Sequence, residues 1–182
     1  QEKESRRKGS SRRSGRSRIM RLGDLLHEKT IKLDLHANNK HAAIEELVDA
    51  LIDAHEIPLS MRAHALEIVK EREKEASTGL EYGVAAPHGL SDRVDDIIVA
   101  LGTCRVGIPF DSVDGIAARI VVLILFPRRS FHGNIQTMAG VAHLFSNAKL
   151  RDAIRAANSP ADVLKIIRDE EAKEAFHTHL AK

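Results

Sequence analysis

The segment from Arg72 to Gly89 carries the residues of this chain that are best suited to chemistry. His88 follows a short apolar run and is flanked by Pro87 and Gly89, so we expect it at a strand end beside a cavity, with Gly89 allowing a tight turn. An imidazole with an ordinary pKa of ~6.5 is a nucleophile in its neutral form. Upstream, Arg72 supplies a permanent cation that can bind two phosphate oxygens at once. This combination predicts a site for phosphoryl chemistry.

The loop between Arg72 and His88 adds small hydrogen-bond donors. The hydroxyls of Ser77 and Thr78 and the backbone at Gly79 are candidate ligands for phosphate oxygens. The same three residues also suit the end of a helix followed by a turn. For Arg72, the alternative is a helix-end charge paired with an acidic side chain. The sequence alone leaves these alternatives open.

Strands and helices are predicted to alternate around this segment. Apolar residues at every second position indicate a half-buried strand over 30–35, and short apolar runs indicate buried strands over 84–86, 97–101 and 118–126. Asn39 is a candidate N-cap for a helix with one apolar face. The order predicts an α/β fold, a mixed β-sheet sandwiched by helices.

Four further helices are expected around those strands. Ser60 is a candidate N-cap for a helix that runs toward Glu75 and delivers Arg72 near its C-terminal end. After the last strand, apolar spacing predicts helices around 135–145 and 150–154, and a third that starts at Ser159-Pro160.

Composition bounds the number of domains. A chain of 182 residues with 43% hydrophobic content can bury one core of ordinary size. Cys104 is the only cysteine, so an internal disulfide is excluded and a reducing compartment, the cytoplasm, is expected. The longest apolar run, 120–126, is far shorter than the ~20 residues that span a bilayer, so we expect no membrane insertion.

Charge divides the chain into two parts. Residues 1–21 hold nine Lys or Arg and two Asp or Glu, whereas the remainder is net acidic. The low apolar content of 1–21 predicts a basic, disordered N-terminal extension. It lacks the aromatic residues that stack on bases and a helix-period apolar face, so we expect neither specific nucleic-acid binding nor a membrane-surface helix there.

The central motif as a whole resembles the active-site signature of the phosphotransferase-system (PTS) IIA domains of the fructose–mannitol type, type 2, which include the nitrogen-regulatory IIA proteins. The resemblance covers about Leu22 to Glu171, so we expect a IIA domain over 22–172 and a C-terminal tail over 173–182. It is carried by Arg72-Glu73, Ser77-Thr78-Gly79, Gly83 and Pro87-His88-Gly89, and downstream by Gly107-Ile108-Pro109-Phe110-Asp111, Asp114-Gly115 and Phe126-Pro127.

The resemblance implies a three-layer fold and a phosphocarrier mechanism. His88 would be the phosphorylated nucleophile and Arg72 the phosphate clamp, with phosphate-binding groups from Ser77, Thr78 and Gly79. The phosphoryl donor would be the phosphohistidine of a small carrier, HPr or its nitrogen-pathway relative NPr. Neither a metal nor a cofactor is expected.

One position departs from the sugar-transporting members of the family. Those members carry a second histidine beside the active one, and this chain has Asn134 there, with His132 as a possible substitute two residues earlier. The departure favours a stand-alone nitrogen-type regulator, whose phosphorylation state would control a kinase or transporter. The alternative is a sugar-transport component that passes phosphate to a fructose/mannitol-type IIB domain. A non-catalytic protein-binding module is a more distant alternative.

Overall fold

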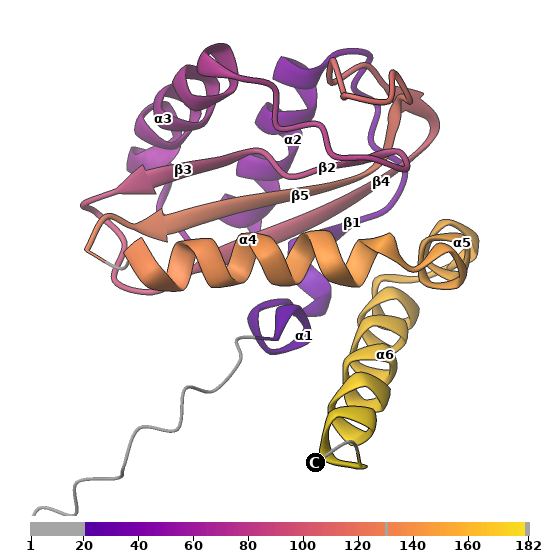
Figure 1. Cartoon of the computed structure of the whole chain (residues 1–182). Helices are drawn as coiled ribbons and strands as arrows, with labels where there is room; N and C mark the ends of the chain where they lie inside the picture. The colour runs from indigo at the N-terminus through magenta and orange to yellow at the C-terminus, as the bar shows by residue number, and fades with distance from the viewer. Residues whose placement is uncertain (1–20, 130, 181–182) are drawn as a thin grey trace, which may run out of the picture.

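The computed structural model describes residues 21–129 and 131–180. The basic extension expected over 1–21 therefore lies, apart from Arg21, outside the described residues. The core of the molecule is one five-stranded mixed sheet (Figure 1). The strands run in the order β1-β4-β5-β2, and β3 also pairs with β5. Their bounds are β1 Ile31–Lys32, β2 Val84–Ala85, β3 His88–Ser91, β4 Ile98–Ile108 and β5 Ala118–Pro127.

Strand β5 is the central strand of the sheet because it pairs with three other strands. It lies antiparallel to β4 and parallel to both β2 and β3. From Ile120 to Phe126 its side chains are buried and alternate between two hydrophobic cores, one on each face. A strand covered on both faces needs apolar residues at every position. This explains the unbroken apolar run that the sequence shows there.

Helices cover both faces of the sheet (Figure 1). Helices α2 (Lys40–Asp53) and α3 (Arg62–Glu75) pack on one face. The other face is covered by α1 (Leu22–Leu25), α4 (Phe131–Ser146), α5 (Ala148–Ala156) and α6 (Pro160–Leu180). Two single 3₁₀ turns, η1 (Glu28–Thr30) and η2 (Leu59–Met61), precede β1 and α3. The predicted sheet sandwiched by helices is confirmed.

Two helix caps agree with the sequence and one does not. The Asn39 side chain accepts a hydrogen bond from the Ala42 N–H at 2.9 Å, and Ser159 Oγ accepts one from the Asp162 N–H at 3.1 Å. The prediction that Ser60 caps α3 is wrong. Ser60 lies inside η2, which leads straight into α3 with Met61 at the N-cap and no side-chain hydrogen bond.

Two predicted boundaries also differ from the structure. The strand expected over 30–35 is only Ile31 and Lys32, because Asp34 takes a left-handed backbone with φ of 59° and turns the chain out of the strand direction. At the other end, helix α6 continues to Leu180, past residue 172 where we expected the domain to give way to a tail. The domain boundaries themselves remain predictions.

Candidate active site

His88 begins β3 where two short strands lie end to end beside β5. Val84 of β2 pairs with Ile120, and His88 of β3 pairs with Ile124, so Pro87 falls in the gap between the two strands. A proline is tolerated in that gap because it has no N–H to donate to the sheet. His88 therefore lies at a strand end, as predicted, but at the start of β3.

Gly89 makes no turn, contrary to our expectation, and continues β3 instead. Its lack of a side chain serves packing. A Cβ built at Gly89 would lie 2.8 Å from Cγ1 of Ile68 on α3, closer than real side chains approach. The glycine thus lets α3 pack directly against the strand that carries His88.

The imidazole of His88 is held in one tautomer. Its Nδ1 lies 2.9 Å from the carbonyl oxygen of Ala86. A carbonyl oxygen only accepts hydrogen bonds, so Nδ1 must carry the proton and Nε2 must keep its lone pair. The ring of Phe126 meets the imidazole edge-on, with centroids 6.1 Å apart and planes at 73°. These contacts fix the ring and leave the lone pair of Nε2 available.

The surroundings of His88 keep its ring neutral. Burial lowers the pKa of His88 below the ordinary histidine value, because burial disfavours the charged imidazolium. The nearby Arg72 cation lowers it further, while the hydrogen bond to Ala86 and the carboxylate of Glu73 act in the opposite direction. The net direction is downward, so the imidazole is in its neutral form, with one proton on Nδ1, at neutral pH.

Three of the predicted site residues border one cavity. Arg72, His88 and Asn134 line a space of about 790 Å³, within the ~300–1,000 Å³ typical of ligand pockets. Much of the remaining wall is apolar and comes from α3, β3 and α4. The other lining residues are Ile68, Glu71, Glu75, Leu80, Gly89, Leu90, Phe126, Arg128, Ile135, Met138 and Ala139.

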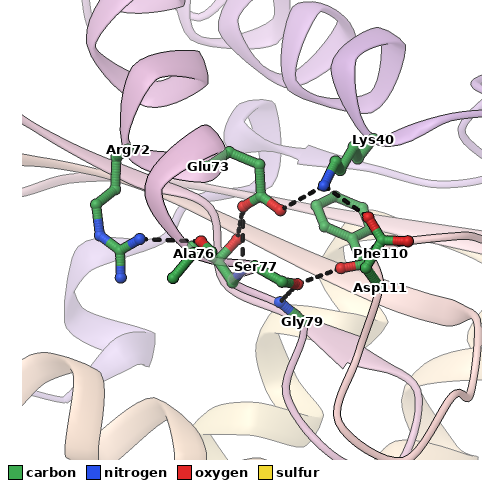
Figure 2. A network of polar contacts seen from close by, with 9 residues as sticks. Lys40, Arg72, Glu73, Ala76, Ser77, Gly79, Phe110 and Asp111 are labelled. Atoms are coloured by element: carbon green, nitrogen blue, oxygen red, sulfur yellow. Dashed lines mark hydrogen bonds and ion pairs between the residues drawn. The ribbon is translucent and has the colours of Figure 1, made fainter.

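Arg72 reaches this cavity from the last turn of α3. Its Nη1 donates a hydrogen bond to the carbonyl oxygen of Ala76 at 3.0 Å, which ties the guanidinium to the C-terminal end of the helix (Figure 2). A guanidinium has five N–H donors, so this contact leaves others for an anion in the cavity. Among the described residues Arg72 pairs with no acidic side chain, contrary to the alternative stated for it, and its role as a phosphate clamp stays a prediction.

Asn134 lies in the first turn of α4 and is 8% exposed. Its side-chain oxygen is buried without a hydrogen-bond partner among the residues that the structure describes. A buried polar atom without a partner is costly, and such atoms concentrate at functional sites. The side chain of His132, the predicted substitute, lies outside the described part of the chain.

The Ser77-Thr78-Gly79 loop does not border the cavity. Ser77 Oγ donates to the carbonyl oxygen of Phe110 and accepts a hydrogen bond from the Gly79 N–H at 3.0 Å (Figure 2). The side chain of Thr78 donates to the carboxylate of Glu73. These contacts hold the loop in place, as the turn interpretation expects, and the phosphate-binding role of the loop stays a prediction.

Glu73 is a structural centre that the sequence analysis missed. It is 2% exposed, and its Oε2 accepts a hydrogen bond from the Thr78 N–H at 3.1 Å. Lys40, the first residue of α2, lies 3.3 Å from Oε1 of Glu73 and 2.8 Å from Oδ2 of Asp111 (Figure 2). The Arg-Glu pair at the start of the motif was the available signal. Glu73 thus joins α2, α3 and two loops beside the cavity.

A second cation at the cavity, Arg128, was also missed. It follows the last residue of β5, and its Nε pairs with Asp92 at 3.1 Å. Its position directly after an apolar strand was the signal in the sequence.

In 21–129 and 131–180, no three His, Cys, Asp or Glu residues gather in a way that could hold a metal ion. No helix of that part is long and apolar enough to cross a membrane.

Comparison with known families decides what this site belongs to. The family model described as "Phosphoenolpyruvate-dependent sugar phosphotransferase system, EIIA 2" matches residues 24–170. The chain belongs to this family. It is an EIIA component, a phosphohistidine carrier of the phosphotransferase system.

Relatives of this EIIA chain carry both sugar-transport and regulatory names. It is 30% identical over 139 residues to the fructose-specific EIIA component of Haloferax volcanii, covering 76% of this chain and 89% of that protein. It is 26% identical over 148 residues to the nitrogen regulatory protein of Bradyrhizobium diazoefficiens, covering 81% and 95%. It is also 28% identical over 152 residues, 84% of this chain, to the fructose-specific EIIABC component of Bacillus subtilis, and spans 24% of that longer protein.

Solved structures share the fold of this EIIA chain. The nitrogen regulatory protein IIA-Ntr from Neisseria meningitidis aligns with a TM-score of 0.72 and 28% identity, covering 80% of this chain and 97% of that one. The mannitol IIA of Escherichia coli aligns with a TM-score of 0.66 at 23% identity, covering 78% and 98%. The comparisons thus give the family and the fold, while the relatives divide between two subtypes.

Proposed function

We propose that His88 is the phosphorylated residue of this EIIA chain and that it takes its phosphoryl group from the phosphohistidine of a small carrier, HPr or NPr. The observation that carries the proposal is the hydrogen bond from His88 Nδ1 to Ala86, which leaves Nε2 with a free lone pair on a ring that borders a cavity with Arg72. The lowered pKa of His88 supports it, because only the neutral ring is a nucleophile.

In the proposed step the lone pair of Nε2 forms a bond to phosphorus. The phosphorus–nitrogen bond of the donor breaks at the same time, and its electron pair returns to the donor imidazole. Such a transfer depends mainly on alignment and charge stabilisation. The fixed ring of His88 supplies alignment, and Arg72 supplies positive charge for the phosphoryl oxygens. The Asn134 amide, on the same cavity wall, adds hydrogen-bonding capacity.

The rim of the cavity fits a protein donor. Leu90 and Ile135 are 36% and 56% exposed although both are large apolar residues, and Met138 lies beside them on the cavity wall. Exposed apolar side chains grouped around a reactive residue are typical of a surface that binds another protein. We propose that the carrier docks there, so that its phosphohistidine reaches His88.

Among the two subtypes, we propose the stand-alone nitrogen-type regulator. Asn134 supports this choice, because it borders the cavity where sugar-type members are expected to carry a second histidine. An amide makes hydrogen bonds but cannot take up a proton. In a regulator, the phosphate on His88 would add negative charge to the docking surface and change its affinity for a kinase or transporter. We further propose 22–172 as the bounds of the IIA domain.

The alternative is a sugar-transport component that passes phosphate to a fructose/mannitol-type IIB domain. The 30% identity to the fructose-specific component of Haloferax volcanii favours it. In that case Asn134 would have to support onward transfer without the help of a second imidazole.

One experiment in two stages tests these proposals. In the first, the protein is incubated with phosphoenolpyruvate, Enzyme I and HPr, and its intact mass is measured. The wild type and His143→Ala, which alters an exposed histidine on α4, should each gain one acid-labile phosphoryl group. His88→Ala should gain none. An adduct that persists in His88→Ala, or a wild type that stays unmodified, would overturn the assignment of His88.

In the second stage the phosphorylated protein is mixed with a fructose-type IIB domain. A regulator should retain its phosphoryl group, and Asn134→His should release it faster than the wild type. Rapid transfer from the wild type, equal to that of Asn134→His, would establish the sugar-transport alternative.

A further inference from the structure

A second cavity, of about 520 Å³, lies away from His88. It is bordered by the β4–β5 pair and by the segment from the end of α5 to the start of α6. Arg119, at the start of β5, borders it, whereas His88 pairs with Ile124. These two positions of β5 are five residue steps apart, or about 17 Å along the strand. The two cavities share no lining residue.

Three arginines from three different elements border this second cavity. They are Arg105 of β4, Arg119 of β5 and Arg155 of α5. Two of them are already paired, since Arg105 lies 3.1 Å from Asp34 and Arg155 forms an ion pair with Asp152. The guanidinium of Arg119 has no ion-pair or hydrogen-bond partner in the described parts of the chain.

The backbone around these side chains is fixed in unusual ways. Both Arg119 N–H and Ile120 N–H donate to the carbonyl oxygen of Gly83, at 2.8 and 3.2 Å, which is the double contact of an irregular strand. The partner strand β4 shifts register between Thr103 and Ile108. Bulges of this kind turn side chains away from the regular alternation and recur beside functional sites. The irregularity therefore accounts for a charged side chain at Arg119 in an otherwise buried strand.

Asp34 also borders this cavity, and contacts with Thr103 hold its backbone in place. Its φ of 59° is rare for a residue with a side chain. The Asp34 N–H donates to Thr103 Oγ1 at 3.2 Å, and the Leu35 N–H donates to the Thr103 carbonyl oxygen at 2.7 Å. This arrangement places the carboxylate of Asp34 against Arg105, so the wall is built before any ligand arrives.

We propose that this cavity is a binding site for a small metabolite with a phosphate or carboxylate group, and that Arg119 is its principal ligand. A guanidinium recognises both groups through paired N–H donors, and the unpartnered one is free to do so. The three arginines outnumber the two aspartates that border the cavity, so the wall carries net positive charge although the chain beyond residue 21 is net acidic. No aromatic side chain borders it to stack on a base, so the ligand is smaller and simpler than a nucleotide.

The test is an NMR titration of the full chain, labelled with ¹⁵N, at low ionic strength. Inorganic phosphate and citrate serve as the two probes and separate the phosphate from the carboxylate source. At least one probe should produce saturable shifts at the Arg119 side chain and at the backbone amides of Thr103 and Asn158, which border the cavity. Sodium chloride at equal ionic strength should not.

Two variants define the site. Arg119→Gln should weaken the saturable binding about tenfold, as expected for the loss of one charge-assisted contact. Arg129→Gln, which alters an exposed arginine paired with Asp95, should bind like the wild type. Arg119 is exposed, so its loss should leave the dispersed spectrum of the folded protein unchanged.

The outcome is independent of the phosphocarrier proposal. His88→Ala should still bind the probe, because His88 does not border this cavity. The proposal would be overturned by shifts confined to the residues around His88, by an affinity that Arg119→Gln leaves unchanged, or by the absence of saturable shifts with both probes.

Discussion

At the scale of single residues, the site depends on which atom of His88 is already engaged. The carbonyl oxygen of Ala86 accepts a hydrogen bond from the Nδ1–H, so in the proposed transfer Nε2 is the nitrogen with a free lone pair before any phosphoryl donor arrives. Ala86 lies only two residues earlier in the chain, in the gap between β2 and β3. On either side of Ala86, the carbonyl oxygens of Gly83 and Pro87 accept hydrogen bonds from β5, so the carbonyl oxygen of Ala86 is left for the imidazole.

The charge state of His88 gives the prediction that belongs to this scale. Arg72 lowers the pKa of His88, because a nearby cation disfavours imidazolium. Arg72→Gln should therefore raise the pKa of His88 from its value in the wild type, which lies below the ordinary ~6.5. The ring protons of His88, followed by NMR over a pH series, measure both values.

The control for this titration is Arg129→Gln. Arg129 is paired with Asp95 and does not border the cavity, so its loss should leave the His88 titration in place. A downward shift in Arg72→Gln, or an equal shift in the two variants, would contradict the electrostatic role assigned to Arg72.

Site residues can be predicted from the sequence where they belong to one short motif, and not where their partners are remote in the chain. His88, Arg72 and Asn134 were identified from one motif and its expected partner position, and the structure places all three on one cavity. The partners of Glu73 could not be identified in this way. Lys40 and Asp111 are far from Glu73 in the chain, and only the fold brings them together.

At the scale of elements, the end of α3 is fixed by one buried carboxylate. Glu73 accepts from the backbone of Thr78 and pairs with Lys40 at the start of α2. Glu73→Ala should lower the free energy of unfolding by about 3 kcal/mol, because it leaves the buried N–H and hydroxyl of Thr78 without their acceptor and removes one of the two carboxylates paired with Lys40. Urea denaturation followed by circular dichroism measures this change.

A matched variant exists on the same helix. Glu67 of α3 is exposed and enters no ion pair within the described ranges, so Glu67→Ala should leave the denaturation midpoint almost unchanged. Equal effects of the two substitutions would show that the buried network does not account for the loss in Glu73→Ala.

Strand β5 and the segment 30–35 show where the spacing of apolar residues predicts a strand correctly and where it does not. The apolar run of β5 was predicted within a residue of its observed end, because burial on both faces leaves a clear signal. The segment 30–35 shows the alternation of a strand as well. It departs from one at Asp34 because contacts with Thr103 hold a left-handed backbone there, and Thr103 is remote in sequence. The arginines of the second cavity escaped notice for the same reason.

At the scale of the whole molecule, the two ends of the described chain are joined. The carboxylate of Glu171, on α6, accepts hydrogen bonds from the N–H groups of Leu22 and Gly23 at 2.6 and 3.0 Å. Arg168, also on α6, donates to the Gly23 carbonyl oxygen at 3.0 Å. Helix α6 thereby supplies the N-terminal hydrogen bonds that α1 lacks, since α1 has no capping side chain of its own. The first and last helices therefore close one face of the sheet together.

This junction should make stability depend on pH in a direction that can be tested. Burial raises the pKa of Glu171, although the hydrogen bonds from Gly23 and Leu22 oppose the shift, so the native state takes up a proton more readily than the unfolded chain. The stabilising contribution of that proton is complete below the unfolded pKa of about 4.3 and is lost as the pH rises through the folded value.

Glu171→Gln has no such proton to bind. The difference in unfolding free energy between wild type and Glu171→Gln, measured by urea denaturation, should therefore shift in favour of the wild type as the pH falls from 7 toward 4.5. A difference that is flat with pH, or that shifts the other way, would contradict the burial of this carboxylate. The control is Glu67→Gln, which removes an exposed carboxylate.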